Sequence, residues 1–306
     1  MTTAWLSVSR DPEWGGGVAR GATALARTGG FHTVFVGRRP GERWPRLGDA
    51  RRVREAPGDA VLVHTSLRHR ALLRDAALTR RESRPVLLWF HGTDRRLATG
   101  APTGFLRALF GSRRAIASTA EQVPWLERLG LEVVGVSPIG WDSERLRGLV
   151  PRPEPRTVLF AGRATVAKGL DRLVAAAAPD FRLLVAGEGP VAGGQRLGFV
   201  DGEAWRTAHG RAQLFALPSR DEGAPVSLLE ALGAGLPALV TDVGAMASLV
   251  GDAGWVVPKD VNPVELGGFL RAAFADADEL AWRAAAAPER AAPFTAERVA
   301  RWFLAL

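Results

Sequence analysis

The sequence predicts an α/β protein with two doubly wound domains in tandem. Its 306 residues suit two domains of roughly 150 residues each. Short apolar runs alternate with helix-length segments, a pattern typical of parallel sheets covered by helices on both faces. The alternation stops once, at 149–156, where three prolines in eight residues indicate an extended linker, and then resumes. We therefore expect domains at 1–148 and 157–290.

The expected elements follow from the apolar runs and the spacings between them. In the first domain we expect strands at 4–8, 31–37, 60–63, 85–90, 114–117 and 132–136, with helices at 17–28, 66–82, 102–111 and 119–129. In the second domain we expect strands at 157–161, 182–186, 212–217, 238–241 and 254–257, with helices at 168–178, 224–234 and 262–275.

A last helix is expected within 291–306. Val299, Trp302, Phe303 and Leu306 are spaced i, i+3, i+4, i+7 and so form one apolar face. We expect this helix to pack back on the first domain.

Composition excludes several classes of protein. No apolar run approaches 18 residues, which excludes a spanning helix, and the first residues lack the pattern of a secretory signal. We therefore expect a cytoplasmic protein. Cysteine is absent, which excludes disulfides, thiolate metal sites and cysteine nucleophiles.

Charge is unevenly divided between the two halves of the chain. Residues 1–150 hold 24 Lys and Arg against 14 Asp and Glu, whereas residues 151–306 hold 16 against 18. One interpretation is a solvated basic surface. The other is that the first half meets an anionic partner, such as a phosphate, an acidic acceptor or an anionic membrane surface.

The segment Pro218–Ala231 carries the strongest candidate site. A strand ends near Leu217 and a helix begins near Ala224, so the N–H groups of 223–226 would point out of the helix end, beside Glu222. A helix N-terminus next to a glycine is a natural diphosphate site. Glu230 lies eight residues on, roughly 12 Å along the helix. The alternative is that Glu222 caps the helix and Glu230 is a surface residue.

Two further loops follow strands in the second half. Phe160–Leu170 holds Gly162, Arg163 and Lys168, two cations that could neutralise a leaving diphosphate or could simply be surface charges. The turn Gly187-Glu188-Gly189-Pro190 would let backbone approach a flat ligand, or would be a plain turn.

Together these segments resemble the retaining glycosyltransferases of family 4, which have the GT-B fold of two Rossmann-like domains facing a cleft. The resemblance covers about 158–260 and rests on the order and spacing of the family's motifs. These are Gly162-Arg163, Lys168-Gly169, Gly187-Glu188-Gly189-Pro190, Pro218-Ser219, Glu222 with Glu230-Ala231, and Gly235-Leu236-Pro237 followed by Thr241 and Gly244. The family often has a Glu four residues after Gly244, where this chain has Ser248.

The resemblance implies roles for individual residues. Arg163 and Lys168 would contact the diphosphate of a nucleotide-sugar donor, and Glu230 its ribose. Glu222 would hold the donor sugar, together with the backbone of Gly223, Ala224, Pro225 and Val226, while Gly162 and Glu188 would complete the donor site. Transfer would be a front-face attack with retention, in which the leaving phosphate helps to deprotonate the acceptor hydroxyl.

The first half resembles the family more loosely. Gly15, Gly16 and Gly17 stand where the family has a glycine-rich loop against the donor phosphate, and His91 stands where many members place a histidine at the reaction centre. His64 is a second candidate, and the alternative for His91 is a structural histidine. The segment 138–142 resembles the family's hinge. The chain is short for the family, and the shortening falls in the acceptor half.

The expected partners are a nucleotide-sugar donor and an acceptor glycan, glycolipid or small molecule, with peripheral contact to an anionic membrane at its inner face. No nucleic acid and no cofactor are expected. Asp276-Ala277-Asp278 has the spacing of a metal-binding pair but reads as an acidic helix end, so we expect no metal requirement.

Two alternatives remain open from the sequence. The chain could be a non-catalytic protein that binds sugar nucleotides. It could also be an NADP-dependent oxidoreductase, because Gly15, Gly17 and Gly21 approach a dinucleotide-binding pattern and Gly37-Arg38-Arg39 could suit a 2′-phosphate.

Overall fold

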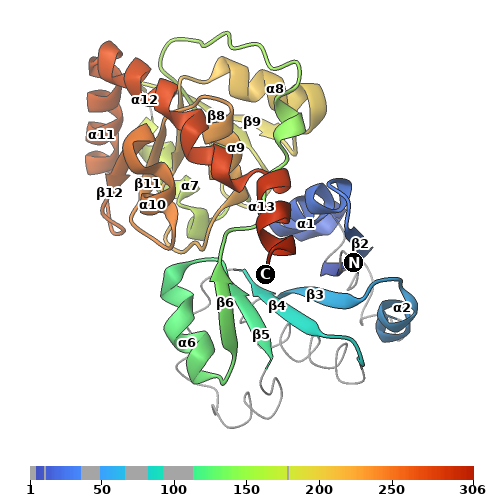
Figure 1. Cartoon of the computed structure of the whole chain (residues 1–306). Coiled ribbons are helices and arrows are strands. Elements are labelled where there is room, and N and C mark those ends of the chain that lie inside the picture. Colours follow the sequence, from blue (N-terminus) through green and yellow to red (C-terminus); the bar gives the residue numbers. More distant parts are fainter. Residues whose placement is uncertain (1–4, 10–11, 36–48, 66–81, 92–112, 178) are drawn as a thin grey trace. The chain divides into compact units, whose positions relative to one another are not determined.

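The protein is an α/β fold with two parallel sheets, as the sequence predicts (Figure 1). Each sheet has six strands within the residues that the structure describes. The computed structural model describes residues 5–9, 12–35, 49–65, 82–91, 113–177 and 179–306. The expected helix at 102–111, all of the one at 66–82 except Glu82, and the segment Gly37-Arg38-Arg39 lie outside these residues. The chain divides into a first unit, Met1–Asp142 with Phe294–Leu306, and a second unit, Ser143–Pro293.

The sheet of the first unit has the order β2-β1-β3-β4-β5-β6. Its strands are β1 (Trp5–Ser9), β2 (Phe31–Phe35), β3 (Ala60–Thr65), β4 (Val86–Phe90), β5 (Arg114–Ala117) and β6 (Glu132–Val136). Its described helices are α1 (Pro12–Arg27), α2 (Asp49–Glu55), the 3-10 helix η1 (Ala120–Gln122), α6 (Val123–Arg128) and the last helix, α13 (Ala296–Leu304).

The two faces of this sheet are packed differently. Leu88 and Phe90 of β4 point into an aliphatic core with Val53 of α2 and Leu126 of α6. Trp89 points to the opposite face, where it stacks on Phe303 of α13. Because side chains alternate along a strand, His91 shares the face of Trp89 rather than the aliphatic core.

The sheet of the second unit has the order β12-β11-β10-β7-β8-β9. Its strands are β7 (Thr157–Ala161), β8 (Arg182–Ala186), β9 (Gln195–Gly198), β10 (Leu214–Leu217), β11 (Ala238–Thr241) and β12 (Gly254–Val257). Its helices are η2 (Ser143–Leu146), η3 (Val166–Lys168), α7 (Leu170–Ala177), α8 (Gly202–Arg211), α9 (Val226–Gly233), α10 (Met246–Val250), η4 (Gly251–Ala253), α11 (Pro263–Ala275), α12 (Ala277–Ala291) and η5 (Ala292–Phe294), which ends across the boundary.

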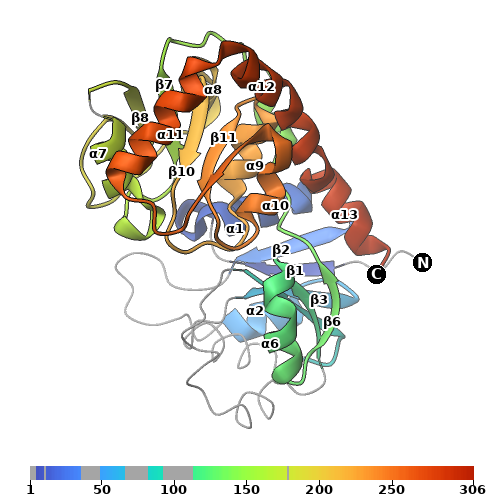
Figure 2. The same cartoon turned by 90° about the vertical axis from the view of Figure 1, so that its left-hand side faces the viewer.

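Helices cover both faces of this second sheet. The chain moves one way along the sheet from β7 to β8 and the other way from β10 to β11, so right-handed crossovers put α7 and α9 on opposite faces. Helix α11 packs beside α7, and α12 packs beside α9 (Figures 1 and 2). The order reverses between β7 and β10, the switch point at which doubly wound sheets bind ligands.

The chain passes between the units earlier than the proline-rich segment suggests. The boundary falls between Asp142 and Ser143, and residues 149–156 belong to the second unit. There the amides of Arg152 and Glu154 donate to the carbonyls of Gly210 and Arg211 at 2.8 Å. These bonds hold the segment against α8 as part of the unit.

The last helix belongs to the first unit. The amide of Trp141 donates to the carbonyl of Phe294 at 3.0 Å, and the amide of Ala296 donates to the carbonyl of Trp141 at 2.9 Å. Phe303 is 1% exposed, and its ring lies 5.5 Å from that of Phe31. Leu306, expected on the same apolar face, is 41% exposed.

The sequence-based expectation for the second unit lacks strand β9 and helices α8, α10 and α12. Strand β9 lies at the sheet edge and is largely polar, so it lacks an apolar run. Helix α8 has only Trp205 as a large apolar residue. The Asp276 segment is a helix end, as expected: Asp276 caps α12 by accepting from the amide of Glu279 at 2.8 Å.

Phe303→Ala should reduce the free energy of unfolding by about 3–5 kcal/mol, because it leaves a cavity against Phe31 and Trp89. Leu304→Ala is the matched control, since Leu304 is 40% exposed on the same helix. Urea unfolding of both variants measures the difference. Equal effects would show that α13 does not complete the core of the first unit.

Candidate functional site

The β7–η3 and β10–α9 loops meet at the switch point of the second sheet. Gly169 ends η3 with a left-handed backbone (φ 73°), and a Cβ there would lie 1.8 Å from the carbonyl oxygen of Pro218. The amide of Arg220 donates to the carbonyl of Ala167 at 2.9 Å. Only glycine permits this approach, so the Lys168-Gly169 pair is a packing requirement as well as a candidate binding motif.

Lys168 and Glu222 form an ion pair between these two loops. Glu222 is 9% exposed, and its Oε1 also accepts from the hydroxyl of Ser219 at 3.2 Å. The structure therefore brings together the two residues that the sequence places 54 positions apart. Glu222 does not cap the helix: α9 begins at Val226 with Pro225 as its N-cap and no side-chain cap.

The start of α9 differs from the expectation in one respect. The helix begins two residues after Ala224, and Pro225 has no N–H group, so Val226 and Ser227 supply the first helical amides. The carbonyl of Gly223 is used within the unit, since it accepts from the amide of Ala245 at 2.8 Å. Of the predicted amides at 223–226, the one at 225 is therefore missing from the anion site.

Glu230 is buried, which excludes the surface-residue interpretation. It is 3% exposed on α9, and its Oε1 accepts from Nη1 of Arg145 at 2.5 Å. Arg145 comes from η2, which precedes the first strand of the unit. Arg145 was not predicted from the sequence, because no motif around it indicates a link to Glu230.

The Gly187–Pro190 turn packs directly on the β7 loop. The amide of Gly162 donates to the carbonyl of Ala186 at 2.9 Å, and the amide of Ala164 donates to the backbone carbonyl of Glu188 at 2.8 Å. A Cβ on Gly187 would lie 1.7 Å from the carbonyl oxygen of Gly162. The side chains of Glu188 and Arg163 are exposed. The turn therefore lies beside the loop that carries Arg163.

A buried guanidinium, also missed from the sequence, ties helix α7 to the loops after β10 and β12. Arg172 of α7 is 4% exposed and donates to the carbonyls of Pro218 and Ser219 after β10 and of Lys259 and Val261 after β12. Each of these acceptors is backbone. Such bonds cost much to break in a buried setting, so Arg172 fixes the loop that carries Glu222.

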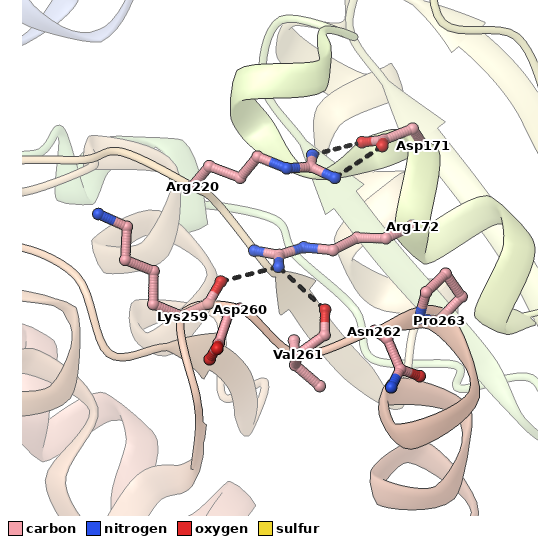
Figure 3. Close-up of a pocket in the computed structure, with 8 residues that line it drawn as sticks. All are labelled: Asp171, Arg172, Arg220, Lys259, Asp260, Val261, Asn262 and Pro263. Atoms are coloured by element: carbon pink, nitrogen blue, oxygen red, sulfur yellow. Dashed lines mark hydrogen bonds and ion pairs between the residues drawn. The ribbon is translucent and has the colours of Figure 1, made fainter.

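A hollow of about 780 Å³ adjoins this guanidinium (Figure 3). Asp171 and Arg220 form an ion pair on one side of it, with contacts of 2.7 and 2.8 Å, and Lys259 and Asp260 line the other. Lys168, Glu222 and Glu230 do not line it. The hollow is therefore separate from the residues predicted to hold a donor.

In the first unit, His91, His64 and Ser118 form a hydrogen-bonded chain at the carboxyl ends of β3, β4 and β5. His91 Nδ1 lies 3.0 Å from Ser118 Oγ, and His91 Nε2 lies 3.0 Å from His64 Nδ1. The Ser118 hydroxyl donates to the carbonyl of Phe90 at 2.7 Å, so it accepts from the Nδ1–H of His91. His91 Nε2 then accepts from the Nδ1–H of His64.

Both of these histidines are neutral at physiological pH. Burial lowers the pKa of His64 to about 3, and burial together with the nearby His64 lowers the pKa of His91 well below its usual value. His91 is 8% exposed. In this arrangement its ring nitrogens are used within the unit, so a contact with a sugar requires that one of these bonds be exchanged.

Gly15, Gly16 and Gly17 lie inside α1 rather than in an open loop. The helix kinks at Gly16, which has φ 65° and ψ −151°. Gly21 packs the same helix against the segment before the boundary, since a Cβ there would lie 2.7 Å from the carbonyl oxygen of Gly140. Among the described residues, no group of three His, Asp or Glu lies close enough to hold a metal ion.

Comparisons with known proteins find a family match within the second unit. Residues 155–268 match the family described as Glycosyl transferases group 1. The glycogen synthase of Anaeromyxobacter is 32% identical over 189 residues, which are 53% of this chain and 40% of that protein. The aligned part spans less than half the length of each of the curated relatives it matches.

Solved structures resemble the whole chain. The sucrose-phosphate synthase of Thermosynechococcus elongatus matches with a TM-score of 0.73 and 18% identity, over 98% of this chain and 96% of that one. HepE of Anabaena, solved with UDP and glucose, matches with a TM-score of 0.70 and 16% identity, over 99% and 98%. These similarities confirm the GT-B class of two α/β units with parallel sheets.

Acid should destabilise the protein through its buried histidines. Burial lowers the pKa of His209, which is 2% exposed, to about 3, whereas an unfolded histidine titrates near 6.5. Below pH 6.5 the unfolded chain therefore binds a proton that the folded chain does not. The free energy of unfolding should fall as pH drops from 6.5 towards 3, by about 1.4 kcal/mol per pH unit for this residue.

Urea unfolding between pH 7 and pH 4 measures this slope. His209→Gln should reduce the slope by about 1.4 kcal/mol per pH unit, the contribution of one proton. His32→Gln, at an exposed position, should leave the slope unchanged. Parallel slopes for wild type and His209→Gln would contradict the assignment.

Proposed function

We propose that this chain, whose residues 155–268 match the glycosyl transferases group 1 domain, is a retaining glycosyltransferase that moves a sugar from a nucleoside diphosphate donor to an acceptor hydroxyl. The observation that carries the proposal is the pairing of two buried carboxylates, Glu222 and Glu230, with Lys168 and Arg145 beside the switch point of the second sheet. The match to HepE, solved with UDP and glucose, supports a nucleotide-sugar donor.

The donor diphosphate would lie between the β7 loop and the first turn of α9. Arg163 is exposed in the β7 loop, and the amides of Val226 and Ser227 lie in the first turn of α9. The ammonium group of Lys168 would exchange part of its contact with Glu222 for a contact with the diphosphate. That exchange would free lone pairs of Glu222 to accept from hydroxyls of the donor sugar, and the cations would stabilise the charge that develops on the leaving group.

The reaction itself would depend on positioning rather than on a protein nucleophile. The leaving phosphate would accept the proton of the acceptor hydroxyl, which attacks from the same face of the sugar. His91 would contact the donor sugar by exchanging its bond to His64. We propose that neither a metal ion nor a cofactor takes part.

The acceptor would bind to the first half, where the positive charge is concentrated. This favours an acidic acceptor glycan, a glycolipid or an anionic small molecule, with peripheral contact to an anionic membrane as a further proposal. Among the described residues, no helix is long and apolar enough to cross a bilayer.

Lys168→Ala and Glu230→Ala should each lower kcat/KM for sugar transfer by about 100-fold or more, since each removes a charged contact to the donor. Lys259→Ala is the matched control, because Lys259 is exposed and lines only the separate hollow. Wild-type protein is assayed with UDP-, GDP-, ADP- and dTDP-sugars to select the donor. Near wild-type rates for both variants would rule out this donor site, and binding without transfer by the wild type would favour a non-catalytic sugar-nucleotide-binding protein.

A further inference from the structure

Arg145 is the centre of a compact polar cluster beside α9. Its Nη1 donates to Glu230 at 2.5 Å, and its Nη2 donates to Asp201, the N-cap of α8, at 2.9 Å. Its guanidinium carbon lies 4.5 Å from the ring centre of Trp205. We call Arg145, Asp201, Trp205, His209 and Glu230 the Arg145 cluster. Elements η2, α8 and α9 therefore meet at the side chain of Arg145.

These contacts fix the direction of the guanidinium. A planar cation whose face rests on an indole and whose two Nη groups are bonded to carboxylates has little rotational freedom left. The side chain of Arg145 is 12% exposed, against 67% for Asp201 and 3% for Glu230. The inner bond to Glu230 is thus shielded from water, and the outer bond to Asp201 is not.

The rest of the cluster supports this arrangement without adding charge. The ring of Trp205 stacks on that of His209 at 3.8 Å, and Nδ1–H of His209 donates to the carbonyl of Trp205 at 2.8 Å. His209 stays neutral, since burial lowers its pKa to about 3. Within the cluster, Arg145 is therefore the cation that pairs with the carboxylate of Glu230.

The cluster is not built for maximal stability. Among the described residues, the buried Nε of Arg145, Nε1 of Trp205 and Nε2 of His209 have no hydrogen-bond partner. Buried polar atoms without partners are uncommon in folded proteins and carry a free-energy cost. An apolar contact between η2 and α8 would avoid that cost, so stability alone does not explain an arginine at this position.

We propose that Arg145 is the positioning residue for ribose recognition, holding the Glu230 carboxylate in the orientation in which the vicinal 2′- and 3′-hydroxyls of a nucleotide donate to it. This inference rests on the proposed function, which assigns the donor ribose to Glu230. It makes the protein selective for ribonucleotide over deoxyribonucleotide donors through a residue that never touches the nucleotide.

Calorimetric titration of the full chain tests the proposal. Wild-type protein is titrated with UDP, GDP and ADP, and the tightest of these is then compared with its 2′,3′-dideoxy analogue. Loss of both hydroxyls should weaken binding to the wild type about 10- to 100-fold, since each is a hydrogen bond to a charged group. The ratio compared is the Kd of the dideoxy analogue divided by that of the ribonucleotide. Arg145→Met should reduce this ratio to about 1–3, because the Glu230 carboxylate is no longer held by a guanidinium.

Three further variants separate positioning from general damage to the fold. Glu230→Gln should also collapse the ratio, and Arg147→Met should keep it, since the side chain of Arg147 is 88% exposed two residues along the chain. Arg145→Lys keeps the charge but loses the planar fork, so an intermediate ratio is expected. This milder variant decides the matter if Arg145→Met does not fold.

The outcomes distinguish this inference from the proposed function. A merely structural role of Arg145 would weaken both ligands equally and leave the ratio at its wild-type value. If Glu230→Gln collapses the ratio while both Arg145 variants preserve it, the positioning role is overturned and the ribose site stands. If the wild type binds none of the three nucleotides, the proposed function fails first.

Discussion

A buried carboxylate must be paired with a cation or with hydrogen-bond donors, and this requirement organises the carboxyl edge of the second sheet. Glu222 and Glu230 are 9% and 3% exposed, and each forms an ion pair with a cation. Lys168 reaches Glu222 from the loop after β7, and Arg145 reaches Glu230 from η2, before the first strand of the unit. The two pairs bring together segments that are far apart in the sequence. The loops of the site are therefore held by the same charges that a donor would use.

Backbone packing supplies the rigidity that these charges need. Arg172 binds carbonyl groups in the loops after β10 and β12, and the glycines at 169 and 187 let neighbouring loops approach more closely than any side chain would allow. Gly244 does the same for the loop after β11, where a Cβ would lie 2.3 Å from the carbonyl oxygen of Glu222. Preorganised groups of this kind stabilise developing charge without rearranging during the reaction.

Much of the fold could be predicted from the sequence because buried parallel strands are continuous apolar runs. The strands with the predicted bounds are β5, β6, β7, β8, β11 and β12. The polar edge strand β9 and helix α8 were missed, since neither has the apolar pattern on which the prediction depends. The position of the unit boundary is a long-range property, set by hydrogen bonds such as that of Arg152 to Gly210, and the prolines alone misplaced it.

The candidate site shows the same division between local and long-range information. Lys168, Glu222 and Glu230 could be found from their spacing around strand ends, because the loops that carry them are local motifs. Arg145 and Arg172 could not, since their partners lie 46 to 89 residues away, and an isolated arginine in a chain rich in arginine gives no signal. Likewise, His91 could be predicted from its place after β4. The hydrogen bonds that its ring nitrogens make to His64 and Ser118 could not be predicted.

A crystal structure of the full chain with the tightest-binding nucleoside diphosphate is the sharpest test of the donor site. We expect the diphosphate beside Arg163, Lys168 and the first turn of α9, with the ribose hydroxyls on Glu230 and the bond from Arg145 to Glu230 intact. A nucleotide bound elsewhere, such as in the hollow beside Arg172, or a ribose turned away from Glu230, would contradict it.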